Sequence, residues 1–389
     1  MSDTPPRAEP FVPRTAPAVL EDLRARLRAT RWPDAPEDAG WSMGTDLGYL
    51  RELVAYWADE FDWQAQEAAL ARFPHFRVQL GGLGVHFVHV RAVAPAGPVL
   101  PLVLSHGWPD SFWRYTKVIP LLTDPGAHGG DPADAFDVVV PDIPGYGYSE
   151  RPAVPLDSIA VAGLWAELMD VLGYPRFGAA GGDLGSHVSR YLALDHADRV
   201  VAVHRTDAGL PVFTGDPAEL TPEERAWFEE VAGWGAVEGA YAAMHRTKPQ
   251  TAAFGLADSP AGLAAWIVEK LRSWSDCDGD VERRFTKDEI LTNVTLYWLT
   301  ETIGSSMRMY RANAAIPPAQ LTRRVEVPSG FSIFRGDLVR PPRAWLERTA
   351  NVVRATEPTR GGHFAAFEEP ELYAEELREF FRPYRAAIG

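Results

Sequence analysis

The chain has 389 residues, of which 46% are hydrophobic and 23% are charged, a composition typical of a globular protein with enough length for two or three domains. Its formal net charge of −15 disfavours nucleic acid as a partner, because phosphates would be repelled. The single cysteine, Cys277, excludes an internal disulfide framework and a cysteine-based zinc site. No apolar run approaches the ~20 residues that span a bilayer, and the start "MSDTPPRAEPFVPR" lacks the features of a signal peptide. We therefore expect a cytoplasmic protein without membrane contact.

The first 95 residues combine two helical patterns with a hairpin. Apolar residues recur at helical spacing from Ala16 to Ala29 and again from Leu47 to Phe61. The stretches "HFRVQL" and "VHFVHVRA" alternate with a period of two around "GGLG", which predicts a β-hairpin. These elements have little core of their own, so residues 1–95 are expected to wrap around a larger core.

An α/β pattern follows the hairpin. The runs "LPLVLSHG" and "FDVVVPDIPG" are nearly all apolar, as in parallel strands that are buried on both faces. A helical pattern, "SIAVAGLWAELMDVLGY", and a strand, "FGAAGG", come next, and this alternation predicts a doubly wound sheet. We assign residues 96–208 to the first part of this core. Residues 325–389 form the second part, where "GFSIFRGD" and "NVVRATE" resume the strands and a last helix begins near Glu371. The helical, aromatic-rich segment 209–324 between them is expected to be a lid over the site.

The stretch "FGAAGGDLGSHVSRYLAL" has the layout of the nucleophile turn of α/β-hydrolases, a strand, a glycine turn and a helix. Asp183 occupies the position at which G-x-S-x-G carries serine. The flanking glycines allow a strained turn, and the N-terminus of the helix favours an ionised carboxylate. The alternative is that Asp183 merely caps the helix.

Three other stretches add to this pattern. "LSHGWPDSFW" follows a buried strand, and its loop predicts an oxyanion hole made by the backbone N–H groups of Trp108 and Leu184. His106 in this loop is interpreted as a structural hydrogen-bonding residue. "TRGGHFAAFEEP" supplies His363, and "SIFRGDLVRPP" supplies Asp337 after a strand. By itself Asp337 is better explained as a turn residue, but the order nucleophile, acid, histidine is that of α/β-hydrolases.

Together these motifs carry a resemblance. The chain resembles the microsomal-type epoxide hydrolase family, α/β-hydrolases with an additional N-terminal region. The matching stretches are "YWADEFDWQAQEAALARFPHF", "GVHFVHV", "SHGWPDSF", "IPGYGYS", "GGDLGSHV", "TKPQTAAFGLADSPAGLAAWIVEKLRSW", "LTNVTLYWLTETIGSSMRMYRAN" and "RGGHFAAFEEPE". Bacterial members include enzymes of natural-product pathways such as those of the enediyne antibiotics, so the resemblance allows a biosynthetic or a detoxifying role.

The resemblance also implies roles for single residues. Asp183 is the expected nucleophile, His363 the base and Asp337 its carboxylate partner, where animal members often carry glutamate. Two lid tyrosines are expected at Tyr241 and Tyr310, for which the alternative is aromatic packing. The resemblance further implies a soluble enzyme that needs no cofactor or metal and whose partners are an epoxide and water. The oligomeric state is left open, with a homodimer as one option.

An aspartate nucleophile suits an epoxide, which has no carbonyl group. A carboxylate that opens the ring is left as an ester, which water can cleave, whereas serine would be left as an ether. The expected product from an apolar or aromatic epoxide is a vicinal diol. One alternative is a haloalkane or haloacid dehalogenase of the same fold, although Leu184 stands where such enzymes often carry tryptophan. Another is an α/β-hydrolase that binds a small molecule without catalysis.

Overall fold

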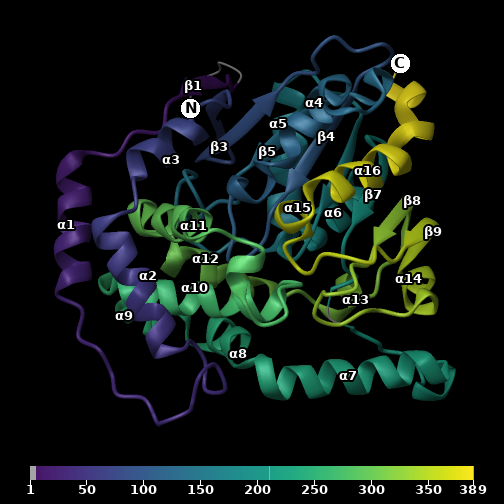
Figure 1. Ribbon diagram of the computed structural model, residues 1–389. Helices are drawn as coiled ribbons and strands as arrows, with labels where there is room; N and C mark the ends of the chain where they lie inside the picture. The colour runs from purple at the N-terminus through teal and green to yellow at the C-terminus, as the bar shows by residue number, and fades with distance from the viewer. Residues whose placement is uncertain (1–5, 210, 389) are drawn as a thin grey trace.

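Across residues 6–209 and 211–388, which the computed structural model describes, a nine-stranded sheet runs through the molecule (Figure 1). Its strands are β1 (Glu9–Phe11), β2 (His75–Leu80), β3 (Leu83–Val90), β4 (Leu100–Ser105), β5 (Phe136–Pro141), β6 (Phe177–Gly181), β7 (Val200–Arg205), β8 (Val325–Ser332) and β9 (Ala350–Thr356). They lie in the order β1-β2-β3-β5-β4-β6-β7-β8-β9. The pairs β1–β2, β2–β3 and β3–β5 are antiparallel, and all other pairs of this sheet are parallel. The predicted α/β class with a mostly parallel sheet is confirmed.

Helices cover both faces of this sheet. α4 (Val118–Thr123) and α16 (Pro370–Phe381) pack together on one face, and α5 (Ser158–Val171) and α6 (Leu184–Asp195) pack together on the other (Figure 1). α14 (Arg343–Thr349) contacts the edge strand β9, and the short α15 (Ala365–Glu368) precedes α16. Strands β4 to β7 are buried along their whole length. Burial on both faces explains why these strands are nearly continuous apolar runs in the sequence.

A helical insertion separates β7 from β8 and lies below the sheet in Figure 1. Its helices are α7 (Pro222–Glu238), α8 (Ala240–Thr247), α9 (Pro249–Asp258), α10 (Pro260–Trp274), α11 (Lys287–Thr300), α12 (Ile303–Asn313) and α13 (Pro318–Leu321). Capping boxes fix the starts of α7 and α11, where Thr221 and Thr286 each exchange hydrogen bonds with a glutamate three residues later. Among the described residues, none of the helices is by itself both long and apolar enough to cross a membrane. α9 and α10 reach that length and composition together, but they meet at a bend of 118°.

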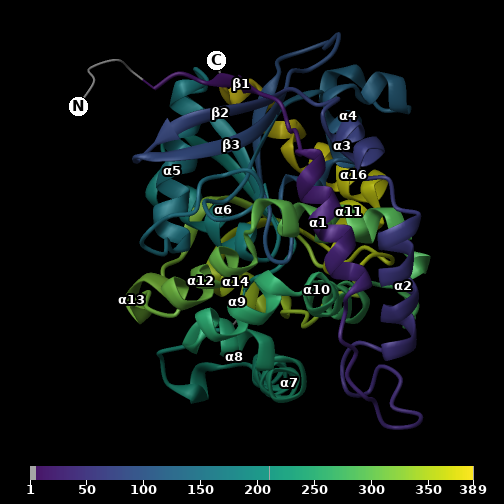
Figure 2. The ribbon, with the colours of Figure 1, turned by 90° about the vertical axis from the view of Figure 1, so that its left-hand side faces the viewer.

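The N-terminal region joins the sheet to this insertion. The predicted helices are present as α1 (Pro17–Arg28) and α2 (Leu47–Asp59), and α3 (Trp63–Leu70) follows them. The predicted hairpin is β2–β3, and β1 extends it at the edge of the sheet. α1 and α2 contact α10, while α3 contacts α11 (Figure 2). A 2.8 Å hydrogen bond from the Tyr56 hydroxyl to Asp288 fastens α2 to α11. The start of the chain, residues 1–5, lies outside the described residues.

Candidate active site

Asp183 sits in a strained turn between β6 and α6. Its φ of +56° lies in the left-handed region, which residues other than glycine seldom adopt. The neighbouring glycines make this turn sterically feasible. A Cβ atom on Gly185 would lie 1.9 Å from the carbonyl oxygen of Ser105, and one on Gly181 would lie 2.4 Å from the carbonyl oxygen of Gly185. The glycines therefore let α6 begin directly against β4 and raise Asp183 above the end of the sheet.

The backbone of the "HGWP" loop reaches the Asp183 carboxylate. The N–H of Trp108 donates a 2.8 Å hydrogen bond to Oδ1 of Asp183, and the N–H of Leu184 is a second backbone donor to this carboxyl group. The close approach requires Gly107, because a Cβ atom there would lie 2.2 Å from Oδ1. His106 hydrogen-bonds to backbone atoms, in line with the structural role expected from the sequence. The two backbone groups assigned to the oxyanion hole thus converge on one carboxylate.

His363 bridges two carboxylates. Its Nε2 lies 3.2 Å from Oδ2 of Asp183, and its Nδ1 lies 2.8 Å from Oδ1 of Asp337. Asp337 lies in the loop after β8, and the N–H of Leu338 donates to its Oδ1 at 2.7 Å. The structure therefore brings together an aspartate, a histidine and a second carboxylate that are far apart in the sequence.

Burial and charge act in opposite directions on these groups. Burial by itself would lower the pKa of His363, but Asp337 and Asp183 outweigh it and raise this pKa to about 10. Burial would raise the pKa of Asp183, but the hydrogen bond and charge of His363 lower it below the usual value for aspartate. Both carboxyl groups therefore favour the protonated form of the His363 imidazole in the resting site.

The two predicted tyrosines meet above Trp108. Tyr241 comes from α8 and Tyr310 from α12, and the centroids of their rings lie 5.9 Å apart. The Trp108 ring stacks on Tyr241 at 5.4 Å and meets Tyr310 edge-on at 6.2 Å. Burial, together with the Asp183 charge, raises the pKa of Tyr241 and contributes to the raised pKa of Tyr310, so both hydroxyls stay protonated at neutral pH.

Comparisons with known proteins bear on what this arrangement does. The family described as epoxide hydrolase N terminus matches residues 8–115, and the alpha/beta hydrolase fold matches residues 101–243. The chain is 43% identical to a protein of Stigmatella aurantiaca named "Putative epoxide hydrolase", over 97% of this chain and 85% of that protein. It is 35% identical to epoxide hydrolase 1 of Sus scrofa, over 95% of this chain and 88% of that protein.

The chain belongs to the epoxide hydrolase family. The solved structure of Aspergillus niger epoxide hydrolase is similar to it, with a TM-score of 0.84, 30% identity and coverage of 97% of this chain and 96% of that one. These relatives are all named epoxide hydrolases, which favours that activity over the two alternatives that the sequence left open, a dehalogenase and a non-catalytic binding protein. The names of these relatives contain nothing about antibiotic synthesis, so an enediyne role is left without support.

Asp207 of this epoxide hydrolase escaped the sequence analysis. It lies two residues after β7, and its Oδ2 accepts a 2.8 Å hydrogen bond from the backbone N–H of Asp183. Burial, followed by the charge of Asp337, raises the pKa of Asp207 to about 6. The available signal was its position in "VVAVHRTDAG", because polar residues at the carboxyl ends of parallel strands gather at the active site of α/β folds.

Buried polar contacts hold the His363 loop in place. Arg114 forms an ion pair with Asp110 and donates a hydrogen bond to the carbonyl oxygen of His363. The N–H of His363 donates to the carbonyl oxygen of Trp274 at 2.8 Å, which ties the loop to the end of α10. Glu368 accepts hydrogen bonds from two further backbone N–H groups of this loop. The position of the imidazole is thus set by both the sheet and the helical insertion.

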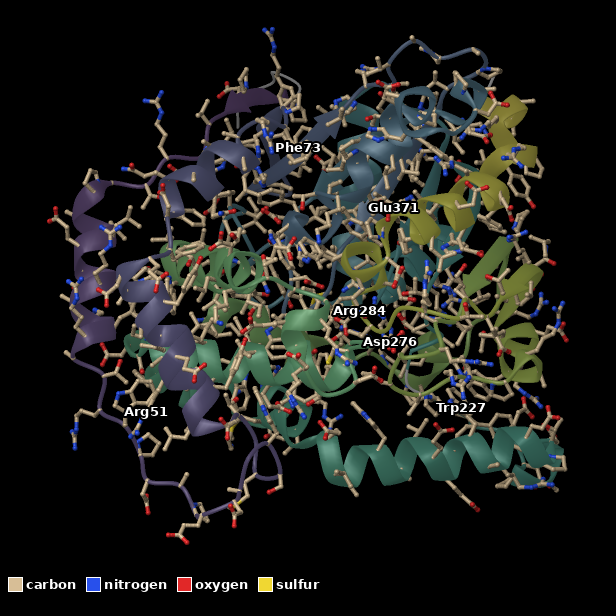
Figure 3. The ribbon with its side chains drawn as sticks, viewed as in Figure 1. Arg51, Phe73, Trp227, Asp276, Arg284 and Glu371 are labelled. Atoms are coloured by element: carbon tan, nitrogen blue, oxygen red, sulfur yellow. The ribbon has the colours of Figure 1, made fainter. Side chains whose placement is uncertain are left out.

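A second connection lies between the insertion and the same loop. Asp276 and Arg284 lie side by side (Figure 3), and the guanidinium of Arg284 pairs with Asp276 at 3.2 Å and with Glu369 at 2.6 Å. Asp276 also accepts a 3.0 Å hydrogen bond from the N–H of Gly361. Movement of the insertion relative to the sheet would therefore disturb the loop that carries the histidine.

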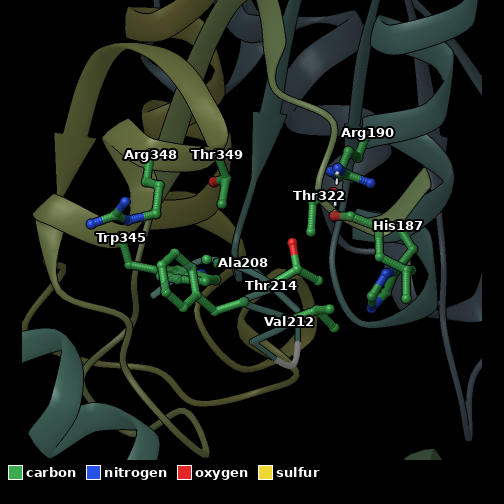
Figure 4. Close-up of a pocket in the computed structure, with 12 residues that line it drawn as sticks. His187, Arg190, Ala208, Val212, Thr214, Thr322, Trp345, Arg348 and Thr349 are labelled. Atoms are coloured by element: carbon green, nitrogen blue, oxygen red, sulfur yellow. Dashed lines mark hydrogen bonds between the residues drawn. The ribbon is translucent and has the colours of Figure 1, made fainter. Parts of the chain in front are cut away.

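A pocket of about 180 Å³ lies at the base of the insertion, where the chain enters and leaves it (Figure 4). His187, Arg190, Thr214, Trp345 and Arg348 are among its lining residues. None of the seven residues predicted for the active site lines this pocket. The side chains of Asp183 and His363 are instead largely buried under the insertion.

The described residues contain no group of three or more histidine, cysteine, aspartate or glutamate side chains arranged to hold a metal ion.

Proposed function

We propose that this enzyme opens an apolar or aromatic epoxide to a vicinal diol through a covalent ester on Asp183. The observation that carries the proposal is the placement of the Asp183 carboxylate between backbone donors on one side and His363 on the other. The aromatic side chains of Trp108, Tyr241 and Trp274 around this carboxylate support an apolar substrate.

The first step alkylates Asp183. Its Oδ1 is held in the oxyanion hole by the N–H of Trp108, and Oδ2, which faces His363, is the atom that attacks a ring carbon. The carbon–oxygen bond of the epoxide breaks, and the alkoxide takes a proton from the Tyr241–Tyr310 pair. The imidazolium of His363 returns a proton to this pair through water, which leaves His363 neutral. The raised pKa of His363 supports this order, because esterification removes one of the two charges that hold its proton.

The second step hydrolyses the ester. Neutral His363, oriented by Asp337, takes a proton from water, and the resulting hydroxide attacks the ester carbon of Asp183. Negative charge develops on Oδ1, next to the N–H groups of Trp108 and Leu184, which act as the oxyanion hole. Loss of one such donor costs about 3 kcal/mol of transition-state stabilisation in other enzymes. The tetrahedral intermediate then collapses with cleavage of the ester C–O bond, and the leaving alkoxide takes the proton of the attacking hydroxide and departs as the diol. Asp183 is again a carboxylate and His363 keeps the proton that it took from water, so no cofactor enters the balance.

We further propose a division of the chain that suits this chemistry. Residues 96–208 and 325–389 form the α/β-hydrolase core, residues 209–324 form the lid, and residues 1–95 form a wrapping region. The two tyrosines in α8 and α12 support a catalytic lid, and the contacts of α1 and α2 with α10 support a wrapping region that steadies it.

Where the enzyme works and how it assembles also belong to this proposal. A single cysteine in 389 residues supports a reducing compartment such as the cytoplasm. The small molecules that the enzyme binds are an epoxide and water. Size-exclusion chromatography with light scattering would show whether the enzyme is a monomer or a homodimer.

One experiment tests the covalent route. A single turnover in water enriched in oxygen-18, followed by proteolysis and mass spectrometry, is expected to place the label in the peptide that contains Asp183. Label in the first-turnover diol would show that water attacks the epoxide directly. His363→Gln should slow the second step, so that an adduct of the mass of enzyme plus epoxide accumulates.

A further inference from the structure

His245 is buried among the aromatic side chains of the proposed site. It follows Tyr241 by one turn of α8 and is 0% exposed. The centroid of its ring lies 4.7 Å from that of Trp108, 4.8 Å from Tyr310 and 5.5 Å from Tyr241, with all three contacts edge-on. The proposed mechanism gives His245 no part, although its ring contacts both tyrosines and Trp108, one of the two residues of the oxyanion hole.

Neither ring nitrogen of His245 has a hydrogen-bond partner within the part of the chain that the structure describes. The indole nitrogens of Trp108 and Trp274 are likewise buried without a partner there. The Trp274 ring lies 5.0 Å from Tyr241 and 5.2 Å from His363, so all of these groups belong to one cluster. Buried polar groups are nearly always paired in folded proteins, so each of these unpaired nitrogens calls for a partner that the described chain does not supply.

The cluster offers more donors than acceptors. Burial and the charge of Lys270 lower the pKa of His245 to about 3, so its imidazole is neutral at pH 7, with one N–H donor and one acceptor nitrogen. Each indole adds one N–H donor. Among these three side chains, three N–H donors stand against one acceptor nitrogen, and the indole of Trp266, 5.9 Å from His245, adds a further unpaired donor. The complementary ligand group is therefore an oxygen that accepts hydrogen bonds.

We infer that His245 and the indoles of Trp108 and Trp274 form a subsite for an acceptor oxygen of the substrate, an ether or carbonyl oxygen close to the epoxide ring. This inference rests on the proposed function and narrows its substrate class. The bulk of the substrate stays apolar, since rings make up the rest of the cluster. A subsite of this kind discriminates against substrates without the oxygen, because its buried nitrogens then stay unpaired.

A packing role for His245 makes a different prediction. Phenylalanine has nearly the same ring shape and keeps the edge-on contacts with Trp108 and Tyr310, but it has no nitrogen. If His245 only fills space, His245→Phe affects all epoxides alike. If it pairs with an oxygen, His245→Phe acts selectively on substrates that carry one, and His245→Gln, which keeps a donor and an acceptor, restores part of the selectivity.

The test uses two epoxides that differ in one atom. Phenyl glycidyl ether and 4-phenyl-1,2-epoxybutane have the same length, with an oxygen in the first where the second has a methylene group. We expect the wild type to have the higher kcat/KM for the ether. His245→Phe should reduce the ratio of kcat/KM for the ether to kcat/KM for the carbon analogue by about tenfold, which corresponds to the loss of one hydrogen bond. His128→Phe, the same change at an exposed residue outside the cluster, should leave the ratio as in the wild type. An unchanged ratio in His245→Phe would overturn the inference.

Binding of the two diol products separates this inference from the proposed function. Their Kd values, measured by tryptophan fluorescence, need no turnover. The wild type should bind the ether diol more tightly than its carbon analogue, and His245→Phe should bind the two more nearly alike. If the wild type hydrolyses neither epoxide but shows this difference in Kd, the substrate choice or mechanism fails while the subsite stands. Equal Kd values of the two diols in the wild type would contradict the proposed subsite, whatever the catalytic result.

Discussion

The backbone N–H of Asp183 donates a 2.8 Å hydrogen bond to Oδ2 of Asp207, so the partly buried carboxylate of Asp207 holds the strained backbone that presents the carboxylate of Asp183. The second oxygen of Asp207 accepts from the N–H of Gly209 at 2.8 Å, where the chain leaves β7 for the helical insertion. The geometry of the nucleophile is therefore coupled to the start of the insertion as well as to the turn that carries it.

We expect Asp207→Ala to slow alkylation of Asp183 by about 10–100-fold, the range found when supporting contacts of a site are removed. The loss arises because the positive φ of Asp183 costs free energy and the hydrogen bond from its N–H helps to stabilise it. Asp207→Asn keeps an acceptor oxygen and should lose much less. Rapid-quench measurement of the alkyl-enzyme would show this order, and equal rates for the two variants would contradict it.

Asp207 also makes stability depend on pH. Its pKa is raised to about 6 in the folded protein, so the folded state binds a proton more tightly than the unfolded state does. The stability that this proton contributes is fully present below the unfolded pKa of about 4 and is lost as the pH rises through 6. Asp207→Asn removes this titration. Its Tm relative to the wild type should therefore increase between pH 4 and pH 8, which thermal unfolding monitored by circular dichroism would detect.

The sequence predicts the sheet and the nucleophile well because their signals are local. Asp183 is marked by a strand, glycines and a helix within a dozen residues, and β4 to β6 are marked by nearly continuous apolar runs. Local patterns were less informative for Asp337. The stretch "GFSIFRGD" suggested a strand up to this residue, whereas β8 ends at Ser332 and Asp337 lies in a loop. β8 is irregular near Pro328, which cannot donate a backbone hydrogen bond.

The roles of Asp207 and His245 also depend on segments that only the fold brings together. The position of Asp207 after a strand marks it only as one candidate among several polar residues, and His245 is an ordinary polar residue of a helix. Asp207 matters because β6 and β7 are adjacent, which places it against the turn of Asp183. His245 matters because α8 and α12 are packed together over the "HGWP" loop.

The charge of Asp183 should be visible in the titration of His363. Asp337 and Asp183 together raise the pKa of His363 to about 10, so Asp183→Asn, which removes one charge, should lower that pKa. NMR titration of the imidazole in both proteins would measure the shift. A pKa of His363 that is the same in both would contradict the coupling, and with it the release of the proton when Asp183 is esterified.

The same pair contributes to stability in a defined pH window. The contribution from His363, whose pKa is raised, is fully present below the unfolded value of about 6.5 and is lost as the pH rises towards 10. The difference in Tm between the wild type and His363→Gln should therefore shrink as the pH increases from 6.5 to 10. A difference that grows over this range would show that the imidazole is neutral in the resting enzyme.

Arg114 is expected to be essential for stability. It is 2% exposed and pairs with Asp110, which is 0% exposed, so Arg114→Met leaves a buried carboxylate without its counter-ion. We expect a loss of about 3–5 kcal/mol in the free energy of unfolding, measured by urea denaturation. The double variant Arg114→Met/Asp110→Asn removes both charges and should recover part of this loss. If the double variant is as unstable as the sum of the two single variants, the ion pair is not the cause.

Gly107 sets the distance between the "HGWP" loop and the nucleophile. In Gly107→Ala the added Cβ atom would lie 2.2 Å from Oδ1 of Asp183, so either the carboxylate or the N–H of Trp108 must move. A displacement of about 1 Å at a reacting group can cost about 100-fold in rate, and we expect kcat to fall by at least this factor. The matched control is Gly163→Ala in α5, where a Cβ atom meets nothing within 4 Å. This control should retain wild-type kcat and gain up to about 1 kcal/mol of stability, because alanine favours the helix over glycine. Equal activities of the two variants would show that the close approach of the loop to Asp183 is not needed for catalysis.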